Sequence, residues 1–445
     1  MRMCLTGDLG GYYTGAIGQD RDQFGVKGDF VTSPEISQIF GELVGVWFIA
    51  EWISQGRPKK GVQLIEVGPG RGTLMDDVLR TVARFPAMAD SIEGIFMVEA
   101  SPELRDTQKQ LLCGPDAQFT KCDAGSQSNG KHIRKPIVWA ESLKSIPVEA
   151  NKMPFIVAHE FFDALPIHTF QSALASAAPS KPLATTAPAA SPARPAGTET
   201  NASVSYEWRE MMVSPTSPTL MASAQAKSRA AGKSEAPEEF QLILSSKPTR
   251  HSRYLPESSS RYRQLKHTPG SVIEICPDAC LYAADFARRI GGSAGVQKPQ
   301  PSGAALILDY GTSETIPINS LRGIRHHKLV SPFSAPGLVD LSADVDFTAI
   351  AEAATLASDG VEVHGPVPQA YFLELMGIKE RAEMLIKAVI TTQGSTTAKS
   401  IENSCKRLID RGPSGMGKVY KVLAILPEND GRRKPVGFGG DVRPT

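Results

Sequence analysis

The decisive stretch reads Gln63-Leu64-Ile65-Glu66-Val67-Gly68-Pro69-Gly70-Arg71-Gly72-Thr73-Leu74. It is an apolar segment that runs into one acid and then into three glycines at every second position. Beyond Thr73 the apolar residues change to helical spacing, so the pattern predicts a strand, a tight turn and a helix. Glycine adopts the φ values of such a turn and lets a ligand approach the bare backbone. The helix N-terminus behind the turn offers unpaired N–H groups.

Two classes of cofactor use a turn of this kind. Dinucleotide enzymes prefer G-x-G-x-x-G around a pyrophosphate, whereas here the order is E-x-G-x-G-x-G, with an acid in the strand end that suits the cationic sulfonium of S-adenosylmethionine. Glu99 ends the next apolar run, where it would take ribose hydroxyls. The two acids favour a nucleoside-type cofactor over a structural connection, and a methyltransferase over a dehydrogenase. The residues expected to bind the cofactor are Glu66, Gly68, Gly70, Gly72 and Glu99.

The composition excludes several classes of protein. At 445 residues the chain can form two or three domains of about 150 residues each. Its 48 basic and 47 acidic residues leave a net charge of +1, which gives no electrostatic footprint for nucleic acid. Six cysteines without a C-x-x-C pair favour free thiols over a metal site. No apolar run approaches the ~18 residues that span a bilayer, so we expect no membrane insertion, and the first residues are too short for a targeting peptide.

Strands and helices alternate after residue 60, which predicts an α/β fold with a doubly wound, parallel sheet. Ligands of such sheets bind beyond the carboxyl ends of the strands, where Glu66, Glu99 and Glu160 would lie. The strands are expected near 62–67, 93–98, 117–119, 137–139 and 154–158, and the helices near 73–84 and 102–112. The expected divisions are an N-terminal cofactor-covering segment, 1–60; a Rossmann-like core, 61–171; an inserted β region, 172–271; the remainder of the catalytic domain with a helical substrate region, 272–426; and a polar tail, 427–445.

Two features flank the predicted core. Ser33 as N-cap and Pro34 in the first helical position predict the start of a helix with a broad apolar face. The segments 173–203 and 214–237 are rich in Ala, Pro, Ser and Thr. They cannot bury enough apolar surface to offset their ordering entropy, so we expect them to be disordered. The strands expected beside them are 204–213 and 240–244.

Several blocks of the sequence together resemble one family. They are 28–42, 66–74, 159–166, 274–277, 309–311 and 340–347. The chain is similar to the mitochondrial complex I assembly-factor methyltransferases, the MidA-type family, over nearly its whole length apart from the two inserts and the tail. The resemblance implies a class I methyltransferase fold, S-adenosyl-L-methionine as cofactor, and symmetric dimethylation of an arginine on a complex I subunit in the mitochondrial matrix. Family members usually carry a further helix and a transit peptide ahead of the region where this chain starts.

An arginine substrate calls for carboxylates, because its fork of donors matches them bidentately. Glu160 and Asp163 follow an apolar strand and would lie at the rim of the crevice. We expect them to grip the guanidinium, with Phe161 and Phe162 walling the channel and His159 as a candidate base. The alternative is that Asp163 caps the short helix that follows, that both Phe side chains are core, and that His159 is structural.

Further residues are expected to surround the cofactor. Ser33, Pro34 and Glu35 would cover it, and Asp123 would approach the adenine unless it is an exposed turn residue. No metal site is expected. Two other functions stay open on the sequence alone. One is an assembly chaperone that binds S-adenosylmethionine without turnover, and the other is a nicotinamide dehydrogenase, which the missing G-x-G-x-x-G spacing disfavours.

Overall fold

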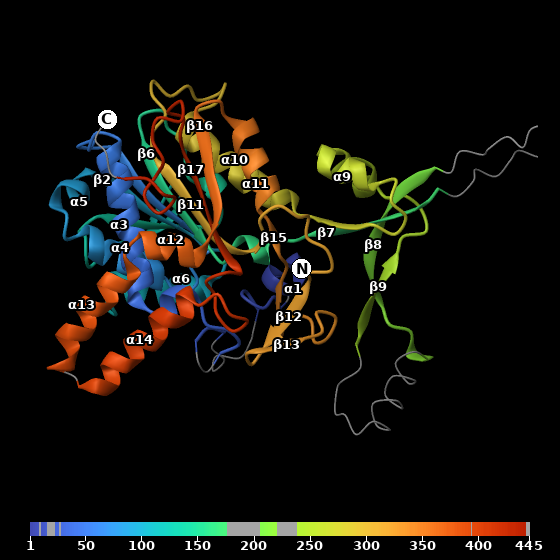
Figure 1. Ribbon diagram of the computed structural model, residues 1–445, viewed down its shortest axis with the longest axis horizontal. Helices are drawn as coiled ribbons and strands as arrows, with labels where there is room; N and C mark the ends of the chain where they lie inside the picture. Colours follow the sequence, from blue (N-terminus) through green and yellow to red (C-terminus); the bar gives the residue numbers. More distant parts are fainter. Residues whose placement is uncertain are drawn as a thin grey trace, which may run out of the picture. The chain divides into compact units, whose positions relative to one another are not determined.

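The computed structural model describes residues 1–8, 10–15, 23–25, 28–175, 205–219, 238–392 and 394–441 (Figure 1). It divides into two compact units, which are Met1–Ile167 with Ser217–Glu239 and Cys276–Thr445, and His168–Thr216 with Phe240–Ile275. Most of the two segments predicted to be disordered, 173–203 and 214–237, lies outside the described residues. No helix in the described part of the chain is long and apolar enough to cross a membrane.

The first unit is built on a ten-stranded sheet. Its strands follow the order β16-β17-β11-β6-β1-β2-β5-β4-β3, and β15 pairs with β11 off this path. The bounds are β1 (Val62–Val67), β2 (Ile92–Val98), β3 (Thr120–Cys122), β4 (Gly125–Asn129), β5 (Pro136–Ala140), β6 (Met153–His159), β11 (Ala304–Thr312), β15 (Val345–Asp346), β16 (Val361–Pro368) and β17 (Tyr420–Pro427).

The strand order indicates where a ligand would bind. We number seven strands of the sheet 1 to 7 in chain order, namely β1, β2, β5, β6, β11, β16 and β17. Across the sheet, from β5 to β16, their spatial order is then 3-2-1-4-5-7-6. The first five are parallel neighbours, and β17 runs antiparallel between β11 and β16. Because of this antiparallel strand, the strand order differs from the order 3-2-1-4-5-6 of dinucleotide-binding folds. The order reverses between β1 and β6, and ligands of open α/β sheets bind at such a switch point.

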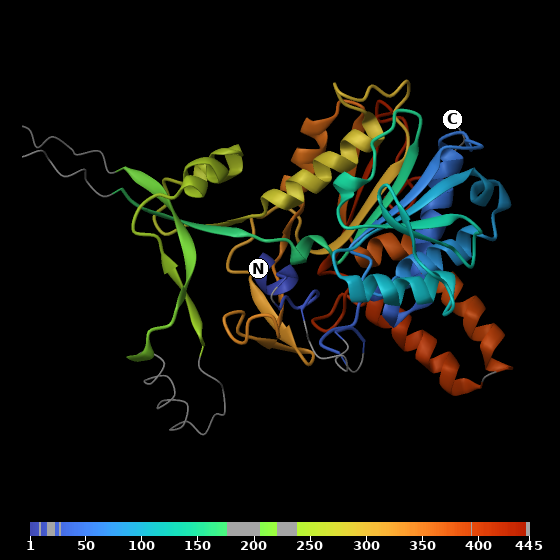
Figure 2. The same ribbon diagram turned by 180° about the vertical axis from the view of Figure 1, so that it is seen from behind.

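Alternate residues of each strand pack into two different hydrophobic cores, because successive side chains point to opposite faces of a sheet. Leu64 and Leu306 pack in one core with α3 to α6 and α12 to α14, while Ile65 and Ile307 pack in the other with α10 and α11 (Figures 1 and 2). The helices are α1 (Arg2–Thr6), α2 (Ser33–Ile36), α3 (Gln38–Ser54), α4 (Thr73–Val82), α5 (Pro86–Ser91), α6 (Pro102–Cys113), α10 (Pro277–Gly291), α11 (Phe347–Ala357), α12 (Gln369–Leu375), α13 (Ile378–Ile390) and α14 (Ser395–Ile409), with 3-10 turns η1 (Leu143–Ser145) and η2 (Phe162–Ala164).

The predicted core elements are confirmed within a few residues, with one exception. The strand predicted at 117–119 is wrong by three residues, because β3 covers Thr120–Cys122. It forms a hairpin with β4, which the sequence did not predict. Most side chains of both strands are exposed or half-buried and polar. They therefore lack the apolar period that reveals a strand.

The single helix predicted from Ser33 is two helices. Thr32 is the N-cap of α2, and its backbone N–H donates to the Glu35 carboxylate at 3.4 Å. Ser37 is extended, with φ of −156°, and its hydroxyl accepts the Ile39 N–H at 3.3 Å to cap α3. Ser33 is thus inside α2 and is not its cap, because a second capping serine interrupts the apolar helix.

The second unit is an antiparallel sheet in the order β10-β7-β8-β9. The strands predicted at 204–213 and 240–244 are confirmed as β8 and β9. Two strands extend into segments predicted to be disordered, since Leu174 pairs with Tyr206 and Pro215 with Phe240. Backbone pairing orders these residues without an apolar pattern. The bounds are β7 (His168–Leu174), β8 (Tyr206–Pro215), β9 (Phe240–Leu244), β10 (Val272–Ile275), α8 (Arg250–Tyr254), η3 (Leu255–Glu257) and α9 (Ser260–Leu265).

A small sheet in the first unit anchors the N-terminal segment. Its order is β13-β12-β14, with bounds β12 (Arg322–Arg325), β13 (Lys328–Val330) and β14 (Asp340–Ser342). Leu5 and Tyr12 are buried against Leu341. The Tyr13 hydroxyl donates to Asp340 Oδ1 at 2.9 Å. These contacts hold the start of the chain against β14.

Candidate cofactor and substrate site

The loop after β1 has glycines at positions where a side chain would not fit. Gly68, Gly70 and Gly72 have φ values of 69°, 53° and 83°, in the left-handed region that favours glycine. A Cβ on Gly68 would lie 2.5 Å from the Phe161 ring, and one on Gly70 would lie 3.3 Å from the Phe24 ring. The predicted strand, turn and helix are confirmed as β1, this loop and α4.

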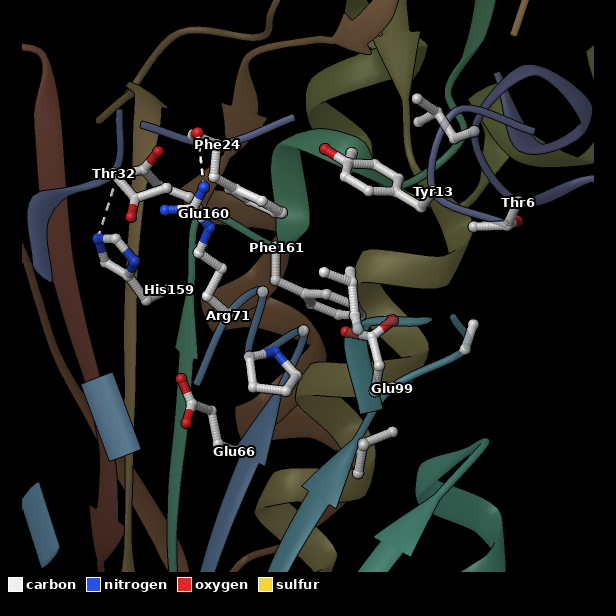
Figure 3. Close-up of a pocket in the computed structure, with 18 of the residues that line it drawn as sticks. Thr6, Tyr13, Phe24, Thr32, Glu66, Arg71, Glu99, His159, Glu160 and Phe161 are labelled. Carbon is white, nitrogen blue, oxygen red and sulfur yellow. Dashed lines mark hydrogen bonds and ion pairs between the residues drawn. The ribbon is translucent and has the colours of Figure 1, made fainter. Parts of the chain in front are cut away.

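A cavity of about 320 Å³ lies beside the loop, at the carboxyl ends of β1, β2 and β6. Its other walls come from α1, α2, the residues between them, the turn after β6 and the first turns of α10. Figure 3 shows Phe161 near the middle of the lining residues, with Glu66 and Glu99 at the strand ends on one side and Tyr13 on the other. The cavity therefore occupies the switch point of the sheet.

Two buried acids lie at the strand ends. Glu66 on β1 is 2 % exposed, and its Oε2 has no hydrogen-bond partner among the described residues. Burial and the neighbouring Glu99 charge raise the pKa of Glu66 well above its ordinary value. Burial raises the pKa of Glu99 to about 7, and the Ser101 N–H and Gln108 oppose that shift. Entry of a cation would offset the cost of ionising both acids.

Gln108 on α6 joins the glycine loop to two strands. Its Nε2 donates to the Gly70 carbonyl at 2.7 Å and to Glu99 Oε2 at 3.3 Å. Its Oε1 accepts the Trp139 Nε1–H at 2.9 Å. The Glu99 carboxylate also accepts the Ser101 N–H at 2.9 Å, so its position is fixed from two sides. No sequence pattern pointed to Gln108, because a helical glutamine belongs to no motif.

Glu160 is the most constrained acid of the cavity. It follows β6 with φ of 48°, a region that residues with a side chain seldom occupy outside functional sites. Its Oε1 accepts the Ser33 N–H at 3.3 Å and lies 3.2 Å from His159 Nε2. Burial and the Asp163 charge raise the pKa of Glu160 to about 8, and burial lowers the pKa of His159 to about 3. At neutral pH the two side chains are therefore a largely protonated carboxyl and a neutral imidazole.

Asp163 lies in the turn after Glu160 but does not line the cavity. Its side chain is buried, and burial raises its pKa. Phe162 is likewise part of the core beneath the sheet, whereas Phe161 lines the cavity. Of the predicted arginine-binding turn, the structure thus brings Glu160, Phe161 and His159 to the cavity, and leaves Asp163 and Phe162 behind them.

Asp309 on β11 holds this turn in place. Its Oδ2 accepts the backbone N–H groups of Phe161, Phe162 and Asp163 at 3.1, 2.8 and 3.2 Å. Asp309 is fully buried, and burial raises its pKa while backbone N–H groups oppose the shift. The acid at the end of this strand was visible in the sequence, but its partner turn lies far away along the chain.

Two of the three residues expected to cover the cofactor line the cavity. Pro34 and Glu35 line the cavity from α2, and Ser33 contributes its backbone N–H to Glu160. Glu35 Oε1 is paired with Arg71 Nη1 at 3.2 Å, and Arg71 Nη2 donates to the Phe24 carbonyl at 2.9 Å. The α2 turn, the glycine loop and the segment near Phe24 are thereby joined above the cavity.

Two predicted cofactor residues do not line the cavity. Gly72 is the N-cap of α4, where a Cβ would approach the Gln108 side chain at 3.2 Å. Asp123 is exposed at the turn between β3 and β4, as the alternative for it supposed. The lining residues that the sequence did not predict include Arg2, Tyr13, Phe24, Arg71, Asp278 and Tyr282.

The lining charges are mainly acidic. Arg71 is paired with Glu35, and Arg2 is paired with Asp278, so these charges cancel. Of the four further lining acids, Glu66, Glu99 and Glu160 are largely buried, whereas Glu141 is exposed. The orphaned Glu66 Oε2 and the bare Gly68 and Gly70 backbone fit a cofactor with a cationic centre and a ribose. They fit a pyrophosphate poorly, because like charges would repel.

Comparison with known proteins decides the family. Residues 43–367 match the family described as putative S-adenosyl-L-methionine-dependent methyltransferases. The chain belongs to this family. The predicted cofactor, S-adenosyl-L-methionine, is confirmed, and the predicted α/β methyltransferase fold is confirmed with it.

Curated relatives of this methyltransferase cover nearly the whole chain. The mitochondrial protein arginine methyltransferase NDUFAF7 of Xenopus laevis is 32% identical over 96% of the chain and 80% of that protein. The human protein of the same name is 31% identical over 96% of the chain and 79% of its own length. The resemblance stated from the sequence blocks is therefore confirmed.

A solved structure shares the fold. It is the crystal structure of a protein from Burkholderia thailandensis described as a likely methyl transferase and bound to S-adenosyl-homocysteine. The TM-score is 0.63 at 20% sequence identity, and the match covers 96% of this methyltransferase and 86% of the other chain. At this identity the likeness concerns the fold alone.

Proposed function

We propose that this methyltransferase dimethylates an arginine of a respiratory complex I subunit symmetrically, in the mitochondrial matrix. The names of its curated relatives, which are mitochondrial protein arginine methyltransferases, support a protein arginine substrate and a mitochondrial location. The complex I subunit, the symmetric product and the matrix compartment follow from the family resemblance. The acidic lining of the cavity suits a guanidinium as well as a sulfonium.

The observation that carries the proposal is the position of Glu160. Its strained backbone presents a carboxyl to the same cavity as the glycine loop and Glu99. The Ser33 N–H and His159 both contact Oε1, which leaves Oε2 as an acceptor for a guanidinium N–H. An acid with a raised pKa suits such a site, because a bound cation would stabilise its ionised form.

Some residues of the cavity would bind the cofactor, and Glu160 would orient the substrate guanidinium. Glu66, Gly68, Gly70 and Glu99 would hold S-adenosyl-L-methionine, which supplies an electrophilic methyl group on a good leaving group. Glu160 would hold the guanidinium in line, at the approach of about 3–3.5 Å that displacement requires. Its carboxylate would also draw the positive charge away from the attacking nitrogen and accept the proton that the nitrogen loses.

His159 acts through Glu160 in this scheme. With a pKa of about 3, its imidazole is neutral and a poor base at physiological pH. Its ring packs on Phe40 with centroids 5.0 Å apart, and its Nε2 lies against Glu160. We therefore assign His159 the orientation of the Glu160 carboxyl, and not the removal of a proton.

The test is methyl transfer to isolated complex I subunits with isotopically labelled S-adenosyl-L-methionine and the full chain. Mass spectrometry of the labelled peptide should find symmetric dimethylarginine. Asymmetric or monomethylated product would overturn the symmetric assignment alone. Cofactor binding without label in any subunit would contradict the enzyme and favour the assembly chaperone. Calorimetry with NAD as the control ligand should show no binding, and binding of NAD would support the dehydrogenase.

A further inference from the structure

A cluster of two histidines and one glutamate lies in the second unit, outside the methyl-transfer site. His168 Nδ1 is 2.9 Å from Glu210 Oε1, and His251 Nδ1 is 3.4 Å from the same oxygen. One ligand atom from each of the three residues lies within 4.8 Å of the other two. Atoms bound about 2.0–2.1 Å from a tetrahedral metal lie about 3.3 Å apart, and the two distances from Glu210 Oε1 are near this value.

The fold of the second unit brings the three residues together. Phe170 on β7 is the register partner of Glu210 on β8. His168 lies two residues before Phe170, so its side chain leaves the sheet on the same face as Phe170 and Glu210. The His168 ring is stacked on Phe170, with an interplanar angle of 6°, which limits its rotation. Two of the three ligands therefore belong to a rigid sheet.

The third ligand is delivered by a segment docked on Glu210. The Glu210 backbone N–H donates to Ser245 Oγ at 3.1 Å, and the Ser245 N–H donates to the Glu210 carbonyl at 2.8 Å. Thr249, the N-cap of α8, also donates its hydroxyl to Glu210 Oε2. This second contact orients the carboxylate and leaves Oε1 toward both imidazoles, as a metal site requires of its supporting residues.

We propose that His168, Glu210 and His251 bind one divalent first-row transition metal of the zinc class. Two imidazoles and a carboxylate select such a metal over Mg²⁺ or Ca²⁺, which prefer all-oxygen ligands. The His251 side chain is 55% exposed, so the fourth position is open to water. The metal would tie α8 to the sheet of β7 and β8.

The proposal is distinct from methyl transfer, since no residue of the cluster lines the cofactor cavity. The sequence could not predict it, because the three ligands lie 42 and 41 residues apart (210 − 168 and 251 − 210) and match no metal-ligand spacing.

The experiment is titration of the metal-free full chain with Zn²⁺ by calorimetry, and with Co²⁺ by visible absorption. One equivalent should bind, with absorption bands of a tetrahedral nitrogen and oxygen site and without thiolate charge transfer. Glu210→Gln and His168→Ala should each abolish this binding. Thr249→Ala should weaken it about 10–100-fold, because it removes the hydroxyl that orients the carboxylate and caps α8, while all three ligands remain.

His267→Ala is the matched control, since His267 is an exposed histidine of the same unit outside the cluster. It should bind Zn²⁺ like the unaltered chain. The far-ultraviolet circular dichroism of each variant checks that it folds. Absence of binding by the unaltered folded chain would overturn the proposal. Binding that persists in Glu210→Gln and His168→Ala would overturn it too, because the metal would then sit elsewhere, for example on the free thiols.

Discussion

Glu160 shows how a single residue can combine strain and burial. A left-handed conformation at a residue with a side chain costs of order 1–3 kcal/mol, and the surrounding structure must compensate for it. Here the Glu160 N–H donates to the Leu308 carbonyl at 2.9 Å, which ties the strained residue to β11. The result is a carboxyl at the cavity wall that a relaxed extension of β6 would direct elsewhere.

Glu160→Gln should abolish methyl transfer and leave cofactor binding nearly intact. Glutamine keeps the size and the contact with the Ser33 N–H, but it cannot pair with a guanidinium or accept its proton. Calorimetry with S-adenosyl-L-methionine and turnover with labelled cofactor measure the two properties separately. Glu141→Gln, at an exposed lining position, is the matched control and should stay active. Unchanged turnover in Glu160→Gln would remove Glu160 from the mechanism.

Gly70→Val should remove cofactor binding. The added Cβ would lie 3.3 Å from the Phe24 ring, at a φ that valine rarely adopts, and the larger side chain would enter the cavity. Gly295→Val is the control, because a Cβ at Gly295 meets nothing within 4 Å and its φ is not positive. Calorimetry should find micromolar binding in the control and none in Gly70→Val. Equal affinity in the two variants would place the cofactor elsewhere.

At the scale of elements, the backbone of the site was predictable where the apolar pattern is strong. The spacing around Glu66 predicts β1, the glycine loop and α4, and the structure has all three. The hairpin of β3 and β4 has no such pattern, and the break at Ser37 depends on one capping hydroxyl. Local patterns also could not show that Asp309 would hold a turn nearly 150 residues away, because that contact exists only in the folded sheet.

Asp309→Asn should loosen the turn that carries Glu160. Asparagine keeps only one acceptor oxygen, so backbone N–H groups of the turn lose a partner, and leaving a buried donor unsatisfied costs about 1–3 kcal/mol. We expect a loss of at least about 2 kcal/mol in the free energy of unfolding, measured by urea denaturation. We also expect a fall in kcat at unchanged cofactor affinity. Asp90→Asn, at an exposed position, should change stability by less than about 0.5 kcal/mol. Equal effects of the two substitutions would contradict this role for Asp309.

At the scale of the whole molecule, near-neutral net charge conceals an uneven distribution. The chain has a net charge of +1, yet three buried acids without an ion-paired arginine or lysine, among the residues described, line one cavity. Glu66, Glu99 and Glu160 all have raised pKa values, with burial as the largest cause. The composition could not show this concentration of acid, because it arises only when three strand ends meet.

The ligand-free protein should lose stability as pH rises from about 6.5 to 8. In this range Glu160, with a pKa of about 8, and Glu99 and Asp340, each with a pKa of about 7, keep protons that the unfolded chain has already lost. Each extra proton in the folded state lowers the free energy of unfolding by about 1.4 kcal/mol per pH unit. His159 does not oppose the trend, because its lowered pKa acts only below about 6.5.

Chemical denaturation at several pH values measures this slope. Glu160→Gln should reduce the dependence of the free energy of unfolding on pH by up to the contribution of one proton, because glutamine does not titrate. Saturating S-adenosyl-L-methionine should also flatten it, since a bound cation favours the ionised acids. A stability that is constant or rising between these pH values would show that the buried acids are already ionised in the free protein.

The hydrogen bond between Gln108 and Trp139 has a spectroscopic consequence. The same amide that holds the glycine loop and Glu99 accepts the indole N–H of Trp139, a fully buried tryptophan. Indole emission depends on the polarity and hydrogen bonding around the ring. We expect a ligand that displaces Gly70 or Glu99 to move the amide dipole beside Trp139 as well. The emission of this tryptophan should then report occupancy of the crevice without any added label.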